Sequence, residues 1–182
     1  MKIAQITPFF YPVIGGMENH VYEISKRLSI KNDVVVFTSN IDRKGKRLKF
    51  FEKLNKIEIR RMRVVFRISE FSSFFPSVFI NVGKENFDII HVHAYRHFHN
   101  FVPLFADVPA VITPHYPVYP FSSSKRRLLA KFFDITMGKK IFSLYSKIIA
   151  LTEGEKIWIK ENFHIPDNKI EVITNGVPEN YL

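Results

Sequence analysis

The chain has 182 residues, of which 46% are hydrophobic and 24% are charged, a balance typical of one globular domain with its own core. It has no cysteine, which excludes disulfides and cysteine metal sites, and no run of some 18 apolar residues that would form a membrane-spanning helix. Its formal net charge of +10 favours an anionic partner such as phosphates, nucleic acid or acidic lipid. The missing cysteines and the absence of a signal-peptide pattern at the N-terminus predict a cytoplasmic protein.

The first half of the chain alternates between apolar runs and an amphipathic segment. From the N-terminus we expect a strand at 2–7, a helix from Met17 to Ile30 and a strand at 33–38. The basic stretch 40–56 is expected to be a loop or an exposed helix, 57–68 to be extended, and Ser72 to Glu85 to be a helix.

The second half has a clearer pattern. Strands are expected at 87–93, within 108–115, at 147–152 and at 169–174. Helices are expected from Lys125 to Tyr145 and from Glu153 to Phe163, and a turn at 175–178.

Short, nearly all-apolar strands that alternate with helices indicate the fold class. Strands of this kind are usually buried on both faces, as in a parallel sheet. We therefore predict an α/β domain with a Rossmann-like, doubly wound, mostly parallel sheet of about six or seven strands. Ligands bind beyond the carboxyl ends of such strands, where the segments 8–16, 93–99, 115–119 and 152–153 should converge.

The pair Gly15-Gly16 directly precedes the first predicted helix. Unpaired backbone N–H groups and the positive end of the helix dipole lie at such a position, and a missing Cβ lets an anion approach. A turn that needs a positive φ explains the pair equally well. The chain has neither the G-x-G-x-x-G dinucleotide fingerprint nor the P-loop motif.

Histidines gather in HVHAYRHFH, residues 91–99. His91 and His93 fall on one face of their strand because side chains alternate along it, and His91 fits a satisfied core position at least as well as a binding role. Since the four histidines lack a clear facial spacing and no cysteine accompanies them, the segment predicts no metal site.

Six segments in chain order carry a family resemblance. They are KIAQITPFFYPVIGGMENHVYEISKRL, DVVVFT, FDIIHVH, VITPHYP, KIIALTE and KIEVITNGVP, and together they cover nearly the whole chain. This arrangement resembles the N-terminal domain of the family 4 (group 1) glycosyltransferases, which have the two-domain GT-B fold.

The resemblance implies the N-terminal half of a GT-B fold. Residues 1–175 would form the acceptor-side Rossmann-like domain, and 176–182 would start the linker between the domains. The donor-binding C-terminal domain, with its E-x7-E motif, would lie outside this chain, because the chain ends six residues after Gly176. The chain alone is therefore expected to be inactive, and its partner would be the C-terminal domain of the same enzyme.

The resemblance also implies roles for individual residues. Gly15 and Gly16 would let backbone amides approach the diphosphate of a nucleotide-sugar donor. His115 would approach the transferred sugar or the acceptor hydroxyl and is the candidate catalytic residue, with a structural histidine as the alternative. His93 would also bind substrate. The family's transfer needs no metal and no cofactor.

Two further site residues have simpler explanations beside the implied one. Glu18 falls in the first helical turn, where the dipole favours a carboxylate, and this competes evenly with substrate binding. Thr152 is first an N-cap and second a substrate-binding residue.

Lys, Arg and Phe mingle in 43–54 and 124–142. In the second stretch Leu128, Phe132, Ile135 and Met137 could share a helical face beside basic residues, which is typical of helices that bind anionic membranes. A helix packed on the sheet is the alternative. No RNA-binding module is recognisable, so no nucleic-acid partner is expected.

The main hypothesis is a retaining hexosyltransferase that moves a sugar from a nucleoside diphosphate sugar to a hydroxyl of a lipid or glycan acceptor. It would be peripheral on the inner membrane face. A non-catalytic module that binds an anionic ligand or a membrane surface is the second hypothesis, and another enzyme with a GT-B-like shape, such as an epimerase, is a weaker third.

Overall fold

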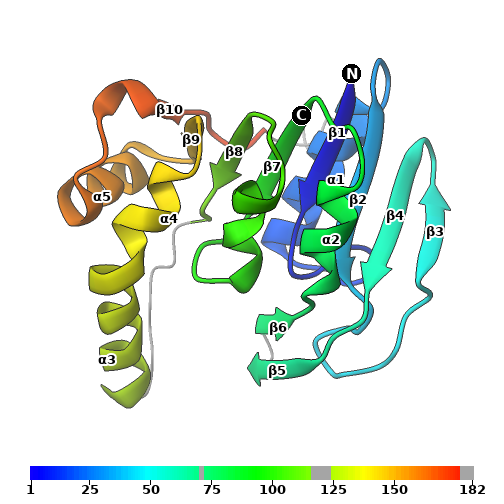
Figure 1. Cartoon of the computed structure of the whole chain (residues 1–182), viewed down its shortest axis with the longest axis horizontal. Coiled ribbons are helices and arrows are strands. Elements are labelled where there is room, and N and C mark those ends of the chain that lie inside the picture. Colours follow the sequence, from blue (N-terminus) through cyan, green and yellow to red (C-terminus); the bar gives the residue numbers. More distant parts are fainter. Residues whose placement is uncertain (70–71, 116–123, 177–182) are drawn as a thin grey trace.

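The computed structural model describes residues 1–69, 72–115 and 124–176. Eight strands form one sheet in the order β10-β9-β8-β7-β1-β2-β4-β3, shown in Figure 1. Every neighbouring pair is parallel except β3 with β4. The strands are β1 (Lys2–Ile6), β2 (Asp33–Ser39), β3 (Phe51–Leu54), β4 (Ile57–Met62), β7 (Ile89–His93), β8 (Ala110–Thr113), β9 (Lys147–Ala150) and β10 (Ile170–Val172).

Both faces of the sheet are covered, which confirms the predicted doubly wound α/β class. In β2, Val34 and Val36 face one apolar cluster, and Val35 and Phe37 face another, as the two-residue period requires. Helix α1 (Gly16–Leu28) covers the first face. The second face carries α2 (Ser77–Gly83), the 3-10 helix η1 (Phe98–Phe105), α4 (Lys139–Ser143) and α5 (Glu153–Phe163).

The strand order places one break at the centre of the sheet. From β1 the chain winds outward through β2 and β4, and from β7 it winds the other way through β8, β9 and β10. β1 and β7 are hydrogen-bonded neighbours. The carboxyl ends of these two strands form the topological switch point where open α/β sheets bind ligands.

Two local expectations were wrong. The stretch 40–56 contains the edge strand β3, which pairs with β4. The segment 57–68 is extended as expected, but it is divided between β4 and β5 (Phe66–Ser69). β5 pairs with β6 (Ser72–Phe74) in a separate hairpin. The helix expected from Ser72 therefore begins only at Ser77, after Pro76, whose φ of −64° suits a helix start. The sheet has eight strands rather than six or seven because of β3.

The long helix expected from Lys125 to Tyr145 is built in three parts. They are α3 (Ser124–Phe133), the π-helix η2 (Asp134–Gly138) and α4. Gly138 lies where a Cβ would overlap the ring of Phe163 in α5, so the lack of a side chain allows this end to pack closely. In Figure 1 α3 extends away from the sheet.

Further along, the 3-10 helix η3 (Asp167–Lys169) connects α5 to β10. The predicted rim segment 115–119 is described only at His115, and the predicted linker 176–182 only at Gly176. Within the described residues, no helix combines the length and the hydropathy needed to cross a membrane.

Candidate functional site

The two glycines at the switch point have different surroundings. Gly15 is the N-cap of α1 with an extended φ of −177°, so the pair does not serve a positive-φ turn there. A Cβ on Gly15 would overlap the carboxylate of Glu18 and lie 2.9 Å from Nη2 of Arg43. A Cβ on Gly16 would meet no atom within 4 Å. A side chain on Gly15 would therefore displace the Glu18–Arg43 pair, whereas the space beside Gly16 is open to a ligand.

Glu18 lies beneath this loop. Its side chain is 1% exposed and its Oε1 accepts a hydrogen bond from Nη2 of Arg43 at 2.6 Å. The Arg43 guanidinium also lies 5.8 Å from the centroid of the Phe9 ring. The carboxylate is thus held by the helix dipole and an arginine, which supports the structural explanation and leaves its substrate-binding role a prediction.

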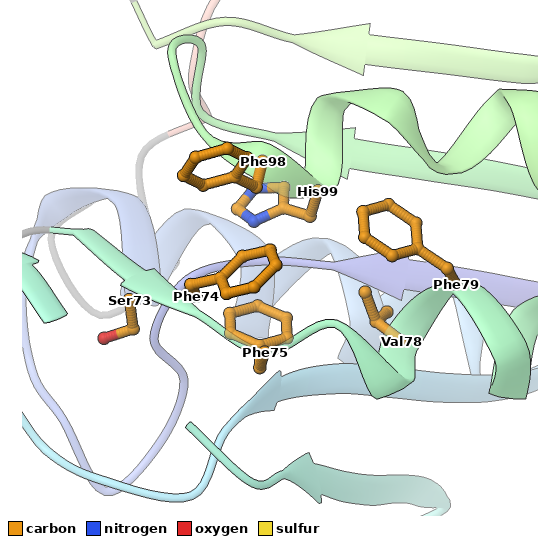
Figure 2. A pocket seen from close by; sticks show the side chains of 7 residues that line it. All are labelled: Ser73, Phe74, Phe75, Val78, Phe79, Phe98 and His99. Carbon is orange, nitrogen blue, oxygen red and sulfur yellow. The ribbon is translucent and has the colours of Figure 1, made fainter. Parts of the chain in front are cut away.

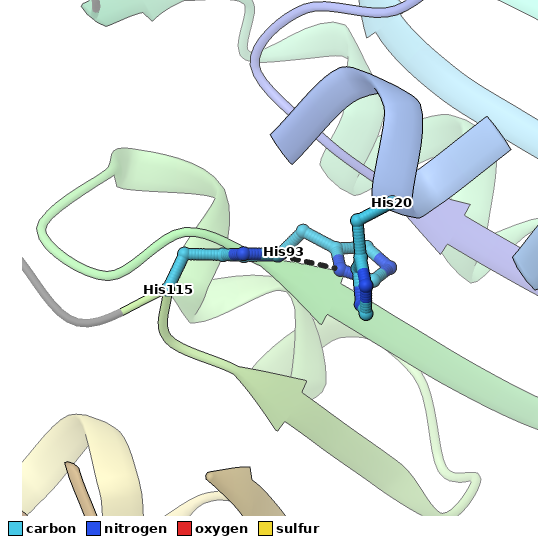
Figure 3. Close-up of side chains that lie close together, drawn as sticks. All are labelled: His20, His93 and His115. Carbon is cyan, nitrogen blue, oxygen red and sulfur yellow. Dashed lines mark hydrogen bonds between the residues drawn. The ribbon is translucent and has the colours of Figure 1, made fainter. Parts of the chain in front are cut away.

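Three histidines from different elements converge beside the glycine loop, as Figure 3 shows. His20 comes from α1, His93 ends β7, and His115 follows β8. One ring nitrogen of each lies within 4.8 Å of the other two. Nδ1 of His93 and Nε2 of His115 are 3.3 Å apart, and the rings of His20 and His115 meet edge to face at 4.9 Å. The predicted residues His93 and His115 are therefore brought together, and His20 joins them.

The orientation of the His93 ring is fixed from below. Its Nε2 lies 2.7 Å from Oε1 of Gln5, in the middle of β1, and both residues are fully buried. Because an amide oxygen only accepts, Nε2 carries the proton and Nδ1 keeps a lone pair that faces His115. The backbone carbonyl of His93 also accepts a hydrogen bond from Nε2 of His99 at 2.9 Å.

His91 lies two residues before His93 in β7. Its ring is 4.0 Å from that of His93, which confirms that the two share a face of β7. Its Nε2 is 2.8 Å from the hydroxyl of Thr113 in β8. His91 is thus a satisfied core histidine, which the sequence analysis held to be at least as good an explanation as a binding role.

The cluster is uncharged at neutral pH. Burial, with a smaller contribution from the neighbouring histidines, lowers the pKa of His91 and of His115 to about 3 and that of His93 well below 6.5. Burial also lowers the pKa of His20, against an opposing hydrogen bond with the side chain of Asn175. The His115 ring is therefore neutral at pH 7 in the ligand-free chain, because burial removes water from it, and its catalytic role stays a prediction.

Thr152 stands apart from the histidines. It ends the loop after β9, two strands from β7, and its hydroxyl accepts a hydrogen bond from the N–H of Glu155 at 3.1 Å. The predicted N-cap is confirmed, and a role in substrate binding stays a prediction.

A second group of side chains lies under the β5–β6 hairpin. Figure 2 shows it between the hairpin, α2 and η1, and its rings meet edge to face or stack, as Phe74 does with Phe98 at 4.8 Å. The space among the seven side chains is too small to hold a water molecule, so this is an aromatic cluster rather than a ligand pocket. They are Ser73, Phe74, Phe75, Val78, Phe79, Phe98 and His99.

Comparison with known proteins decides the family. The model of Glycosyltransferase Family 4 matches residues 14–181. The chain belongs to glycosyltransferase family 4. The resemblance found in the sequence is thereby confirmed.

Relatives of this family 4 chain are longer than it. It is 28% identical over 97% of its length to an uncharacterised glycosyltransferase, MJ1069, of Methanocaldococcus jannaschii, and covers 48% of that protein. It is 32% identical over 48% of its length to the gpi3 subunit of phosphatidylinositol N-acetylglucosaminyltransferase of Schizosaccharomyces pombe, covering 20% of it. The chain thus spans about half the length of the first relative, and its match to the second covers a fifth of that protein.

Solved structures confirm the fold. Sucrose-phosphate synthase of Thermosynechococcus elongatus matches 97% of the family 4 chain with a TM-score of 0.69 at 14% identity, and the chain covers 48% of it. The Anabaena protein HepE in complex with UDP-glucose matches 99% of the chain with a TM-score of 0.60 at 15% identity, with 45% of that protein covered. The chain has the fold of one half of a GT-B glycosyltransferase.

Proposed function

We propose that this chain is the acceptor-side domain of a retaining glycosyltransferase. The enzyme would move a hexose from a nucleoside diphosphate sugar to a hydroxyl of a lipid or glycan acceptor. The observation that carries the proposal is the family match over residues 14–181, together with the convergence of Gly16, His93 and His115 at the switch point.

The donor diphosphate would approach the start of α1. Gly16 leaves open space there, and the first N–H groups of a helix attract anions. HepE, a structural neighbour, was solved with UDP-glucose, which supports a nucleotide-sugar donor. Amides and the helix dipole would stabilise the leaving diphosphate without reorganisation.

A lipid acceptor is supported by the surface of α3. Leu128 and Phe132 of α3 and Ile135 of η2 are 70%, 63% and 75% exposed, and Lys125 and Lys131 of α3 are exposed as well. Met137, expected on this face, is half-buried and packs against the core instead. An apolar face beside basic residues suits a membrane with anionic headgroups. The name of the Schizosaccharomyces pombe relative includes phosphatidylinositol, which is consistent with a lipid acceptor.

The transfer reaction is tested with the complete gene product that contains this chain. It would be incubated with membrane lipid extract or free glycans and each of a set of radiolabelled nucleoside diphosphate sugars. We expect transfer from one donor, with the anomeric configuration of the sugar retained in the product by NMR. Transfer from none of the donors, or hydrolysis of a donor without transfer, would contradict the proposed activity. A product with inverted configuration would contradict the retaining mechanism.

Membrane docking is tested by sedimentation of the chain with liposomes, with and without anionic lipid, at low and high salt. We expect binding that requires anionic lipid and weakens with salt. Leu128→Ser combined with Phe132→Ser should weaken it at least about tenfold, since each buried side chain contributes roughly 1.5–3 kcal/mol. The matched control is Ile157→Ser, at a residue on α5 that is 52% exposed. Equal binding by both variants would exclude α3 as the docking surface.

The α3 surface also favours the second hypothesis, a non-catalytic module that binds anionic membranes. The two experiments separate the hypotheses. Liposome binding through α3 combined with no transfer by the complete gene product would favour the module.

A further inference from the structure

The convergence of His20, His93 and His115 has the geometry of a metal site. In a tetrahedral zinc site with Zn–N bonds of about 2.0–2.1 Å, two ligand nitrogens lie about 3.3–3.4 Å apart. Nδ1 of His93 and Nε2 of His115 are already 3.3 Å apart. The third nitrogen, from His20, lies within 4.8 Å of both, so a small rotation of a half-buried side chain completes the triangle.

The surroundings supply what such ligands need. Metal-binding histidines usually donate their other N–H to an acceptor that fixes the ring, and Oε1 of Gln5 does this for Nε2 of His93 at 2.7 Å. The Asn175 side chain lies near the His20 ring, but by distance and angle Nε2 of His20 is buried without a hydrogen-bond partner among the described residues. A buried ring nitrogen is costly to leave unpaired, and a metal ion would satisfy it.

The charges also favour a cation over an anion. Imidazole nitrogens offer a metal ion their lone pairs, and the three rings bring no fixed positive charge that would hold an anion. Glu18, the nearby buried carboxylate of α1, is paired with Arg43. Three imidazoles suit zinc, whose sites often have three protein ligands and a fourth, open position.

We propose that His20, His93 and His115 bind one Zn²⁺ ion, with the fourth position open to water or to a ligand oxygen. His20 and His115 are half-buried, so this side of the site is less enclosed than His93, which forms its buried floor. The sequence pattern of HVHAYRHFH could not predict this site, because the segment supplies only His93 and the other two ligands come from distant parts of the chain. The family resemblance implies transfer without a metal, so this site goes beyond the proposed function.

The metal alone is the probe, so the outcome does not depend on whether the protein transfers a sugar. The 182-residue chain would be prepared without a histidine tag, freed of metal with a chelator, and titrated with Co²⁺ and then Zn²⁺. We expect one Co²⁺ per chain with the strong visible absorption of a tetrahedral site, displacement by one Zn²⁺, and a higher melting temperature with zinc.

Two variants test the two half-buried ligands, where folding is less at risk than at the fully buried His93. His20→Gln keeps a helix-forming residue in α1, and His115→Asn keeps a residue that tolerates the φ of 53°. Each should weaken metal binding at least about tenfold to a hundredfold, the usual effect of losing even an outer partner of a metal ligand. Circular dichroism and the metal-free melting temperature verify that the variants fold.

The matched control is His164→Asn, which replaces an exposed histidine in the same left-handed conformation at the end of α5. It should bind zinc as the natural chain does. The proposal is overturned if the natural chain binds no stoichiometric metal, or if both ligand variants bind it equally well. Stabilisation by inorganic phosphate without any metal binding would identify an anion site and would also overturn it.

Discussion

Replacing Gly16 with alanine tests whether the glycine loop contacts the donor. No atom lies within 4 Å of the new Cβ, and Gly16 is the first residue of α1. Alanine restricts the unfolded chain more than glycine does and fits helical backbone, so the free energy of unfolding should rise by about 0.4–1 kcal/mol. In a chain of this size that corresponds to a melting temperature about 1–4 °C higher.

The same methyl group would occupy the space through which a diphosphate reaches the amides of α1. A hydrogen bond to a charged group contributes about 1.5–3 kcal/mol. Loss of one such contact should lower kcat/KM for the nucleotide sugar by about tenfold to 150-fold. The assay is transfer by the complete gene product at varied donor concentration. The expected variant is thus more stable and less active.

Two matched glycine variants complete the test. Gly154→Ala changes the second residue of α5, where the nearest atom to a Cβ is Oγ1 of Thr152 at 3.8 Å, and should raise stability without affecting transfer. Gly15→Ala forces the methyl group against Glu18 and should cost about 1–3 kcal/mol of stability. If Gly16→Ala is stabilised and keeps its kcat/KM within about twofold, the loop does not contact the donor and the reasoning fails.

Two further predictions concern buried and paired polar groups. Gln5→Leu should leave the N–H of His93 unpaired, costing about 1–3 kcal/mol in a urea titration, and should weaken zinc binding about tenfold to a hundredfold; unchanged zinc affinity would show that Gln5 does not orient the ring. Partial burial would raise the pKa of Glu85, but hydrogen bonds from Lys2 and Arg60 outweigh it and lower the pKa below 4.5. The stability that the ionised Glu85 carboxylate contributes is therefore full above pH 4.5 and lost as the pH falls through its folded-state pKa. Glu85→Gln should lower the free energy of unfolding by about 0.5–1 kcal/mol at pH 7 and leave it unchanged in acid. A loss of stability that is independent of pH would contradict the pairing.

The parallel core of the sheet could be predicted because its strands are buried on both faces. A run such as DVVVFT can be recognised without its partner strands, since the four consecutive side chains 34–37 are apolar. β3 could not be predicted in this way. It is an edge strand in which Phe51 and Lys53 face solvent while Glu52 and Leu54 are half-buried, so its sequence resembles a basic loop.

The candidate site was predictable where strands end and unpredictable where a helix contributes. His93 and His115 follow apolar strands, and parallel strands bring their carboxyl ends to one edge. His20 was not predicted, because helical periodicity shows on which face of α1 a residue lies but not which strands and loops that face packs against. One signal was present: His20 lies one turn beyond Gly16, at the helix end that points to the switch point.

The π-helix η2 between α3 and α4 determines the directions in which the apolar side chains of these two helices point. A π turn holds one residue more than an α turn, so it rotates everything after it by about 100°. In an uninterrupted α-helix Phe142 would fall within about 40° of the stripe through Leu128 and Phe132. The extra residue turns Phe142 into the core while Leu128 and Phe132 remain outside. If the π turn became an α turn with no residue removed, the stripes would merge into a single one that faces either the sheet or its surroundings. Deleting one residue between Asp134 and Gly138 would also restore an α turn, but it would leave Phe142 on the core side. The rotation about the helix axis that η2 introduces therefore gives the domain two separate apolar surfaces, one that packs on the sheet and one that stays exposed.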